Sequence, residues 1–209
     1  MRALIVHCHP REGSFTAAVR DTVIGRLRAA GAEVRLIDLY AEGFDPVLGP
    51  AEHDGYERVP ENRAGVAGHL AHIEWCDTLI FVYPTWWYGL PAMLKGWLDR
   101  VLLPGSAFVM PEGPGETIRP GLTHVRRLAV FTTCGASRWL TFLIGAPGKR
   151  TILRGVRALC ARDCRTVFAA HYLMDSSTAE SRARHLARVA RRVDRMTGGA
   201  ARGTEARTA

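Results

Sequence analysis

The chain has 209 residues, of which 47% are hydrophobic and 23% are charged, as is ordinary for a soluble globular protein. This length suits one domain, and no apolar run reaches the roughly 18 residues that a membrane span needs. The net charge is +8, but no helix-turn-helix, zinc-finger or RNA-binding signature accompanies it, so we expect neither nucleic-acid binding nor membrane insertion. The five cysteines are scattered and odd in number, which argues against a disulfide framework. The chain opens on a strand-like segment instead of a signal peptide, and we therefore expect a cytoplasmic location.

Strand-like and helix-like segments alternate along the chain, which indicates a parallel sheet with helices on both faces. The first half is predicted to contain a strand at 3–7, a helix at 15–30, a strand at 33–39, an irregular segment at 40–61, a helix at 62–76 and a strand at 78–83. The second half is predicted to contain a helix at 92–103, an irregular segment at 104–123, a strand at 128–133, a helix within 148–162, a strand at 166–172 and a helix at 178–196. One domain would then cover residues 1–196, followed by a disordered tail at 197–209.

Apolar spacing supports several of these elements. The first helix repeats Val19, Val23 and Leu27 every four residues, so that they share one face. Gly31 follows at a position where a helix end favours a left-handed residue. The unbroken apolar run at 78–82 indicates a central strand that is buried on both faces.

Five strands with intervening helices match the flavodoxin-like α/β fold, a doubly wound five-stranded parallel sheet in the order 2-1-3-4-5. Its second strand would alternate Val34 and Leu36 against Arg35 and Ile37. Ligands in this fold bind in a crevice at the carboxyl ends of strands 1, 3 and 4. The unusual residues of this sequence lie in the loops that follow those three strands, which predicts a binding site there.

The loop after the first strand has groups that can hold a phosphate. Ser14 and Thr16 stand at a helix start, where hydroxyls cap the helix and free backbone N–H groups bind anions, and Arg11 adds a cation. Taken alone, this loop is better explained as the start of an ordinary capped helix. His7 and His9 could face the same way as a metal pair, but no third ligand is evident.

The loop after the third strand is rich in aromatic residues. Trp86, Trp87 and Tyr88 offer apolar faces with polar tips, and Gly89 permits close approach of a ligand to the chain. Three successive aromatic residues cannot all point inward from a loop, so we favour ligand or partner contact over packing in a core or interface. A flat, conjugated ligand suits such a loop, and a flavin ring is the best candidate.

The loop after the fourth strand supplies hydroxyl and backbone N–H groups. It contains Thr132, Thr133, Cys134 and Gly135, and the glycine permits an unusual backbone turn. These groups could hydrogen-bond the polar edge of an isoalloxazine and favour negative charge on the reduced ring. An ordinary turn is the alternative. The sequence has no dinucleotide fingerprint, P-loop or nucleophile elbow.

The aromatic loop and the helix after it resemble a long family signature, that of the NAD(P)H:quinone oxidoreductases of DT-diaphorase type in the flavodoxin-like superfamily. Shorter matches lie in the other two loops, and the resemblance spans residues 1–137. The matching residues are Pro84-x-Trp86-Trp87-x-Gly89-x-Pro91-Ala92-x-Leu94-Lys95-Gly96-Trp97-x-Asp99-Arg100-Val101, His9-Pro10 with Ser14-Phe15, and Thr132-Thr133-x-Gly135.

The resemblance implies a homodimer in which the partner subunit completes each active site. It also implies a tightly held flavin, either FMN or FAD, with NAD(P)H as co-substrate. The tyrosine and histidine that mammalian members use after the fourth-strand loop have no clear counterparts here, so no catalytic residue is assigned. By position, the flavin phosphate side would face His9, Ser14, Phe15 and Thr16, the ring would lie against Pro84, Thr85, Trp86, Trp87 and Tyr88, and its polar edge would meet Thr132, Thr133 and Gly135.

The main hypothesis is a flavin-dependent NAD(P)H oxidoreductase that passes two electrons to a flat, quinone-type acceptor by a ping-pong mechanism. NAD(P)H and the acceptor would occupy one aromatic slot in turn. An azo- or nitro-reductase using the same site is the alternative enzyme. A non-catalytic flavoprotein regulatory subunit, of the type that accompanies potassium efflux systems, is the alternative class. The sequence does not decide between FMN and FAD as the cofactor, or between NADH and NADPH as the co-substrate.

Overall fold

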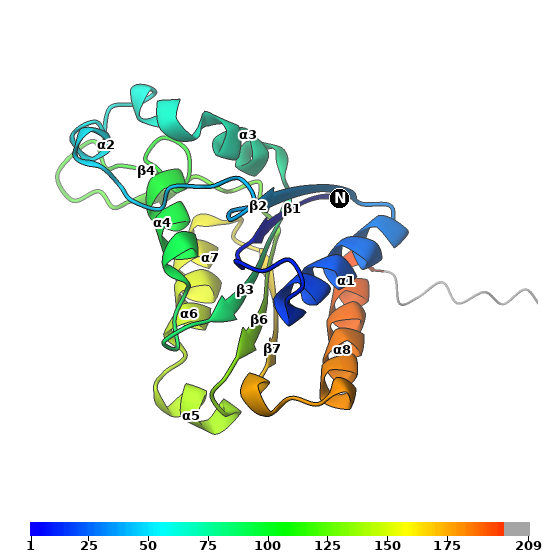
Figure 1. The fold of residues 1–209 in the computed structure, drawn as a ribbon. Coiled ribbons are helices and arrows are strands. Elements are labelled where there is room, and N and C mark those ends of the chain that lie inside the picture. The colour runs from blue at the N-terminus through cyan, green and yellow to red at the C-terminus, as the bar shows by residue number, and fades with distance from the viewer. Residues whose placement is uncertain (199–209) are drawn as a thin grey trace, which may run out of the picture.

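A five-stranded sheet, parallel throughout, forms the centre of the computed structural model, which describes residues 1–198 (Figure 1). Its neighbours pair in the order β2-β1-β3-β6-β7. This order confirms the predicted flavodoxin-like arrangement 2-1-3-4-5, with β6 and β7 as the fourth and fifth strands. The strands are β1 (Arg2–His7), β2 (Glu33–Asp38), β3 (Thr78–Thr85), β6 (Arg127–Cys134) and β7 (Arg165–His171).

Helices cover both faces of the sheet. In Figure 1, α1 (Phe15–Ala29) and α8 (Ala179–Thr197) lie on one side, while α3 (Ala67–Trp75) and α4 (Ala92–Val101) lie on the other. The shorter elements are α2 (Pro50–Asp54), α5 (Arg138–Leu143), α6 (Pro147–Arg150), α7 (Arg157–Leu159), the 3₁₀-helices η1 (Glu61–Val66) and η3 (Met174–Ser176), the π-helix η2 (Thr151–Val156), and a small hairpin of β4 (Phe108–Val109) and β5 (Arg119–Pro120).

The two faces of the sheet bury two separate apolar clusters, because successive strand residues point to opposite faces. Ile5 of β1 packs in the cluster beneath α1 and α8, together with Val23 and Val189. Val6, the next residue along β1, packs in the larger cluster on the other face. Residues Thr78 to Pro84 of β3 are all buried, as the apolar run at 78–82 predicts for a central strand.

In the second strand, β2, the side chain of Ile37 points into the core and that of Leu36 points outward. Ile37 is 1% exposed, whereas Leu36 is 39% exposed. Because β2 is an edge strand, only one of its faces is well covered, so that its outward apolar residue stays accessible.

Several elements differ from the sequence prediction. The helix predicted at 62–76 is split into η1 and α3, and the helix predicted within 148–162 is split into α6, η2 and α7. The segment 40–61 holds the short helix α2, and 104–123 holds the β4–β5 hairpin. The sequence prediction missed α5 entirely. Its apolar residues Trp139, Phe142 and Leu143 are exposed, so no buried face gave it a periodic pattern.

The C-terminal boundary also differs from the prediction. Thr197, predicted as the first residue of the tail, is the last residue of α8, and Gly198 caps that helix with a φ of 76°. The rest of the predicted tail, 199–209, lies outside the described residues. Within residues 1–198, no helix is both long enough and apolar enough to cross a bilayer. The cysteines, at positions 8, 76, 134, 160 and 164, are all free and buried.

Candidate functional site

A cleft with a volume of about 890 Å³ opens at the carboxyl ends of β1, β3 and β6. It lies where the fold predicts a ligand, because the loops that follow these strands meet there. Two further segments contribute to its wall, namely α5 and the connection between β7 and α8. The lining residues are His9, Pro84, Thr85, Trp86, Trp87, Tyr88, Thr133, Cys134, Gly135, Ala136, Leu140, Met174 and Asp175.

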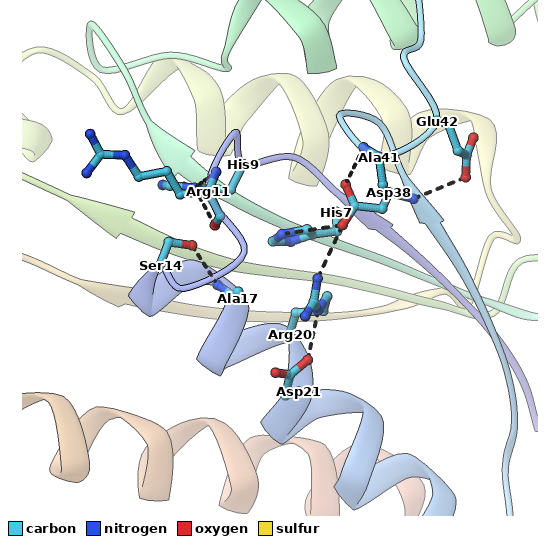
Figure 2. Close-up of polar contacts among 10 residues, drawn as sticks. All are labelled: His7, His9, Arg11, Ser14, Ala17, Arg20, Asp21, Asp38, Ala41 and Glu42. Atoms are coloured by element: carbon cyan, nitrogen blue, oxygen red, sulfur yellow. Dashed lines mark hydrogen bonds and ion pairs between the residues drawn. The ribbon is translucent and has the colours of Figure 1, made fainter.

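The β1–α1 loop is shaped by local hydrogen bonds (Figure 2). The Ala17 amide donates to Ser14 Oγ over 3.1 Å, which makes Ser14 the N-cap of α1. The amides of Phe15 and Thr16 lie in the same first turn and have no acceptor among residues 1–198. Two N–H groups at the start of a 15-residue helix therefore remain available to an anion.

His9 contributes a neutral ring to the cleft wall. His9 Nδ1 lies 3.0 Å from the Arg11 amide nitrogen, from which it can accept, and 3.1 Å from the Arg11 carbonyl oxygen, to which it can donate, so the ring tautomer decides which bond forms (Figure 2). Partial burial lowers the pKa of His9, and the positive charge of Arg11 acts in the same direction. The lowered pKa favours the neutral form of the His9 ring at neutral pH.

His7 lies apart from His9 and belongs to a different network. It is 1% exposed, and its Nε2 lies 3.9 Å from Asp38 Oδ2, which also accepts a hydrogen bond from Arg20 over 3.2 Å (Figure 2). Burial lowers the pKa of His7 to about 4 in spite of the nearby carboxylate. Within residues 1–198, no group of three His, Cys, Asp or Glu side chains could hold a metal ion.

The aromatic loop makes a tight turn with an unusual backbone. Trp87 and Tyr88 have φ angles of 48° and 60°, and the Gly89 amide donates to the Trp86 carbonyl over 2.9 Å. Bulky residues rarely occupy this left-handed region, and such conformations persist only where the surrounding structure holds them. The turn projects the indole of Trp87, which is 95% exposed, whereas Trp86 is 42% exposed.

The start of α6 supports this turn from behind. The Gly148 amide donates to the Tyr88 carbonyl over 3.2 Å. A Cβ atom at position 148 would lie 2.9 Å from the carbonyl carbon of Gly89, so only glycine fits without displacing the loop backbone. The aromatic turn is therefore held by close backbone packing in addition to its own hydrogen bond.

The third loop follows β6 and is packed against the β7–α8 connection. A Cβ atom on Gly135 would lie 2.8 Å from Asp175 Oδ2, so the glycine gives room for the carboxylate beside it. Thr133 Oγ1 lies 3.1 Å from Thr16 Oγ1, and Thr132 Oγ1 lies 2.9 Å from Thr85 Oγ1. The three loops of the cleft are thus connected by side-chain hydrogen bonds.

The structure brings most of the residues assigned to the flavin into one cleft, but four of them do not line it. Ser14 caps α1, and Thr16 and Thr132 are buried and bonded to other threonines. Phe15 packs against the rings of two histidines, with centroid distances of 5.4 and 5.9 Å. The residues that do line the cleft are His9, Pro84, Thr85, Trp86, Trp87, Tyr88, Thr133 and Gly135.

The sequence prediction did not assign a role to several residues of the wall. Cys134 and Ala136 lie in the predicted third loop, and Leu140 belongs to the helix that was missed. Met174 and Asp175 follow β7. No motif predicts a role for these two residues. The available signal was their position directly after a predicted strand, which places them at the carboxyl edge of the sheet.

Comparison with known proteins places the chain in a family. Residues 1–193 match Flavodoxin_2, whose description is "Flavodoxin-like fold". The chain belongs to this family. The Flavodoxin_2 match covers every element that builds the cleft, from β1 to the first three-quarters of α8.

Named relatives fit the resemblance seen in the sequence. The chain is 35% identical over 172 residues to NAD(P)H dehydrogenase [quinone] 1 of Rattus norvegicus, an alignment that covers 73% of this chain and 60% of the relative. This Flavodoxin_2 member thus spans only part of the length of that relative. The resemblance to quinone oxidoreductases is confirmed at the level of sequence similarity.

Two solved structures have the same fold. The NAD(P)H:quinone oxidoreductase from Methanothermobacter marburgensis has a TM-score of 0.77 at 24% identity, with 94% of this chain and 96% of that chain covered. An FMN-dependent NADH-azoreductase from Bacillus anthracis, solved in complex with FMN, has a TM-score of 0.74 at 16% identity, with 94% and 100% covered. At these identities the likeness concerns the fold.

The residues of the cleft fit a flavin. The exposed indoles provide an apolar wall for a flat ring, and the free amides at the start of α1 provide an anion site in the same loop as His9, which lines the cleft. The indoles are not sealed in the interior, and the cleft between them and the third loop is wide. A planar group with a phosphate tail therefore matches both the shape and the donors of this site.

Proposed function

We propose that this protein is a flavin-dependent NAD(P)H oxidoreductase that reduces quinone-type acceptors by two electrons. The observation that carries the proposal is the cleft itself, in which exposed indoles on β3–α4 face the polar loop after β6, beside the free amides of α1. The rat relative and the archaeal structure, which are named for this activity, support the same conclusion.

Each loop would have a distinct task at a bound flavin, which supplies the hydride chemistry. The amides of Phe15 and Thr16 and the neutral His9 would bind its phosphate. Trp86 and Trp87 would lie against the ring and exclude water from one side. The loop at Gly135 would present backbone donors to the polar edge, where negative charge develops on reduction.

We propose a ping-pong order for the two substrates. The cleft has one aromatic wall, so NAD(P)H and a flat acceptor would use the same place in turn. The oxidised nicotinamide must leave before the acceptor enters. Initial rates measured against both substrates should give parallel lines in double-reciprocal plots, and intersecting lines would contradict this order.

Purified protein tests the proposal directly. The preparation should be yellow, and mass spectrometry of the released cofactor should identify FMN or FAD. NADH and NADPH should each be tested for oxidation, with and without a soluble benzoquinone. A flavin-loaded preparation that fails to oxidise either nucleotide would exclude the enzyme and leave the regulatory flavoprotein subunit.

An azoreductase is the second candidate, because the FMN-bound structure from Bacillus anthracis has this fold. It would use the same cleft, so the two candidates differ only in the acceptor. Rates with an azo dye and a benzoquinone, measured at equal concentrations on one preparation, decide between them. A higher kcat/KM for the dye would favour the azoreductase.

We also propose that the chain works as a homodimer. The apolar face of α5 and its end, which we call the α5 patch, consists of Trp139, Phe142, Leu143 and Ile144, all of which are exposed. It continues directly from Leu140 in the cleft wall. A contiguous apolar patch beside a site is typical of a protein interface.

A further inference from the structure

Two hydroxyl pairs connect the carboxyl end of β6 to the other loops of the cleft. Thr133 Oγ1 lies 3.1 Å from Thr16 Oγ1 at the start of α1, and Thr132 Oγ1 lies 2.9 Å from Thr85 Oγ1 at the end of β3. Thr132 and Thr133 are consecutive strand residues, so their side chains point to opposite faces of the sheet. One pair therefore lies on each face.

Because these hydroxyl groups are buried, breaking either contact would cost free energy. Thr16, Thr132 and Thr133 are 2%, 4% and 6% exposed, so water has little access to their hydroxyls. A buried hydroxyl that loses its only partner keeps its desolvation cost without compensation. The Thr132 hydroxyl also donates to the Thr133 carbonyl over 3.3 Å, so for Thr132 the cost is smaller. The paired arrangement is therefore favoured over any displacement of one loop relative to another.

Each pair has one threonine in the cleft wall and one behind it. Thr133 and Thr85 line the cleft, whereas Thr16 and Thr132 stand behind them and do not. Among residues 1–198, no backbone hydrogen bond joins the first turn of α1 to the end of β6. The contact between Thr16 and Thr133, 117 residues apart in sequence, is thus the direct polar link between the predicted phosphate loop and the predicted ring-edge loop.

We propose that Thr16 and Thr132 are positioning residues of the flavin site, which hold Thr133 and Thr85 and thereby set the spacing of the three loops. This inference rests on the proposed flavin function. It assigns the side-chain hydroxyls of these two threonines an indirect role, in contrast to the direct cofactor contact that the family resemblance implies for them, and leaves the Thr16 amide in the phosphate site.

Isosteric and conservative variants test the proposal. Thr16→Val keeps the side-chain shape and removes the hydroxyl, whereas Thr16→Ser keeps the hydroxyl. Flavin-free protein is titrated with FMN and, separately, with FAD, and binding is followed by the loss of flavin emission. We expect Thr16→Val to raise the Kd about tenfold, as for a lost buried hydrogen bond, and Thr16→Ser to stay within about twofold of wild type.

A double-mutant cycle separates positioning from direct contact. If Thr16 acts through Thr133, adding Thr16→Val to Thr133→Val should change the Kd less than about twofold. A residue that contacts the flavin itself would show its full effect in both backgrounds. The pair Thr132→Val and Thr132→Ser repeats the test on the other face, and it serves as the main test if Thr16→Val does not fold.

The outcomes are distinct. Wild-type protein that binds neither FMN nor FAD would overturn the proposed function. Wild-type protein that binds flavin, with valine variants of equal affinity, would overturn the positioning role alone. A lower melting temperature of the flavin-free valine variants without a change in Kd would show that the hydroxyls support only the fold, which also overturns it.

Discussion

Trp87 combines full exposure of a large apolar side chain with a strained backbone conformation. Its φ angle is 48° and its side chain is 95% exposed. Neither property stabilises the isolated chain, since an exposed indole buries little surface and a left-handed tryptophan costs about 1–3 kcal/mol. A ligand contact accounts for both, because it would use the indole that the strained turn projects.

Trp87→Ala should therefore affect binding more than stability. We expect flavin affinity to fall on the order of tenfold through loss of the aromatic wall. The free energy of unfolding of the flavin-free protein should change by less than about 0.5 kcal/mol, as is usual at exposed positions. Flavin titration and urea unfolding measure the two quantities.

The matched control is Ile118→Ala, which removes another exposed apolar side chain, 55% exposed, that neither lines the cleft nor belongs to the α5 patch. It should leave flavin affinity unchanged. Equal losses of affinity in both variants would show that the effect is not specific to the cleft wall.

His185 makes stability depend on pH. It is 2% exposed, and neither of its ring nitrogens has a hydrogen-bond partner among residues 1–198. Burial lowers its pKa from 6.5 to about 4, and His171 and Arg188 nearby act in the same direction. The folded protein therefore holds the neutral ring, while the unfolded chain takes up a proton below about pH 6.5.

The contribution of His185 to stability is fully present above pH 6.5 and is lost as the pH falls from 6.5 toward 4. Because the unfolded state binds more protons in this window, the free energy of unfolding should fall by up to about 1.4 kcal/mol per pH unit for this group. Urea unfolding of wild type and His185→Leu at pH 7, 6 and 5 measures it. The variant should lose less stability on acidification, and parallel pH profiles would contradict the assignment.

Sequence reasoning found the residues of the cleft that belong to recognisable patterns. Trp86 and Trp87 were found because consecutive aromatic residues in a loop cannot all be buried. The roles of Thr16 and Thr132 could not be predicted, because a hydroxyl at a helix start or strand end looks the same whether it meets a ligand or a distant side chain. Asp175 matches no motif, and only its place after the predicted strand at 166–172 pointed to the carboxyl edge of the sheet.

At the level of elements, the support of the aromatic turn by α6 gives a direct test. A methyl group at Gly148 would meet the backbone of Gly89, which cannot move without moving Tyr88. We expect Gly148→Ala to destabilise the protein by about 1–3 kcal/mol and to weaken flavin binding. Thermal unfolding and flavin titration would show both effects.

Gly155→Ala in the π-helix η2 is the control for this substitution, because a Cβ atom there meets nothing within 4 Å. It should leave flavin affinity unchanged and stabilise the protein slightly, since alanine lowers the conformational entropy of the unfolded chain. A loss of affinity at 155 but not at 148 would contradict the supporting role of α6.

The elements that the sequence predicted well are those with a buried face. Helices α1 and α8 have apolar positions at the helical period, and strands β1, β3 and β6 are continuous buried runs, as central strands of a parallel sheet are. The sheet order followed from the match of alternating strands and helices to the flavodoxin-like fold. The misses have a common cause. α5, which was missed, has an exposed apolar face, and η2, which was predicted as part of a helix within 148–162, follows the wider turn of a π-helix, so neither has the 3.6-residue periodicity of an amphipathic α-helix.

On the scale of the whole molecule, the α5 patch predicts self-association. Phe142, at 77% exposure, is the most exposed member of the patch, and a charge there would be desolvated in an interface. Phe142→Glu should convert a dimer into a monomer, which sedimentation equilibrium would detect as a halving of the mass. Activity should fall with it if the partner completes the site.

Leu36→Glu is the matched control, because Leu36 is also an exposed apolar residue but lies on β2, at one edge of the sheet and outside the patch. It should not change the mass. A wild-type protein that sediments as a monomer at all concentrations would refute the homodimer.

The burial of every cysteine has a practical consequence for labelling. Cys8 and Cys76 are fully buried, and burial raises the pKa of both thiols to about 12, so almost no thiolate is present near neutral pH. A maleimide dye should therefore spare Cys8 and Cys76 in the native chain, whereas Cys134 lines the cleft and a hydrogen bond from Cys160 lowers the pKa of the Cys164 thiol. Distance measurements by energy transfer from a cysteine introduced on the exterior therefore require replacement of Cys134 and Cys164, whereas Cys8 and Cys76 can stay in place.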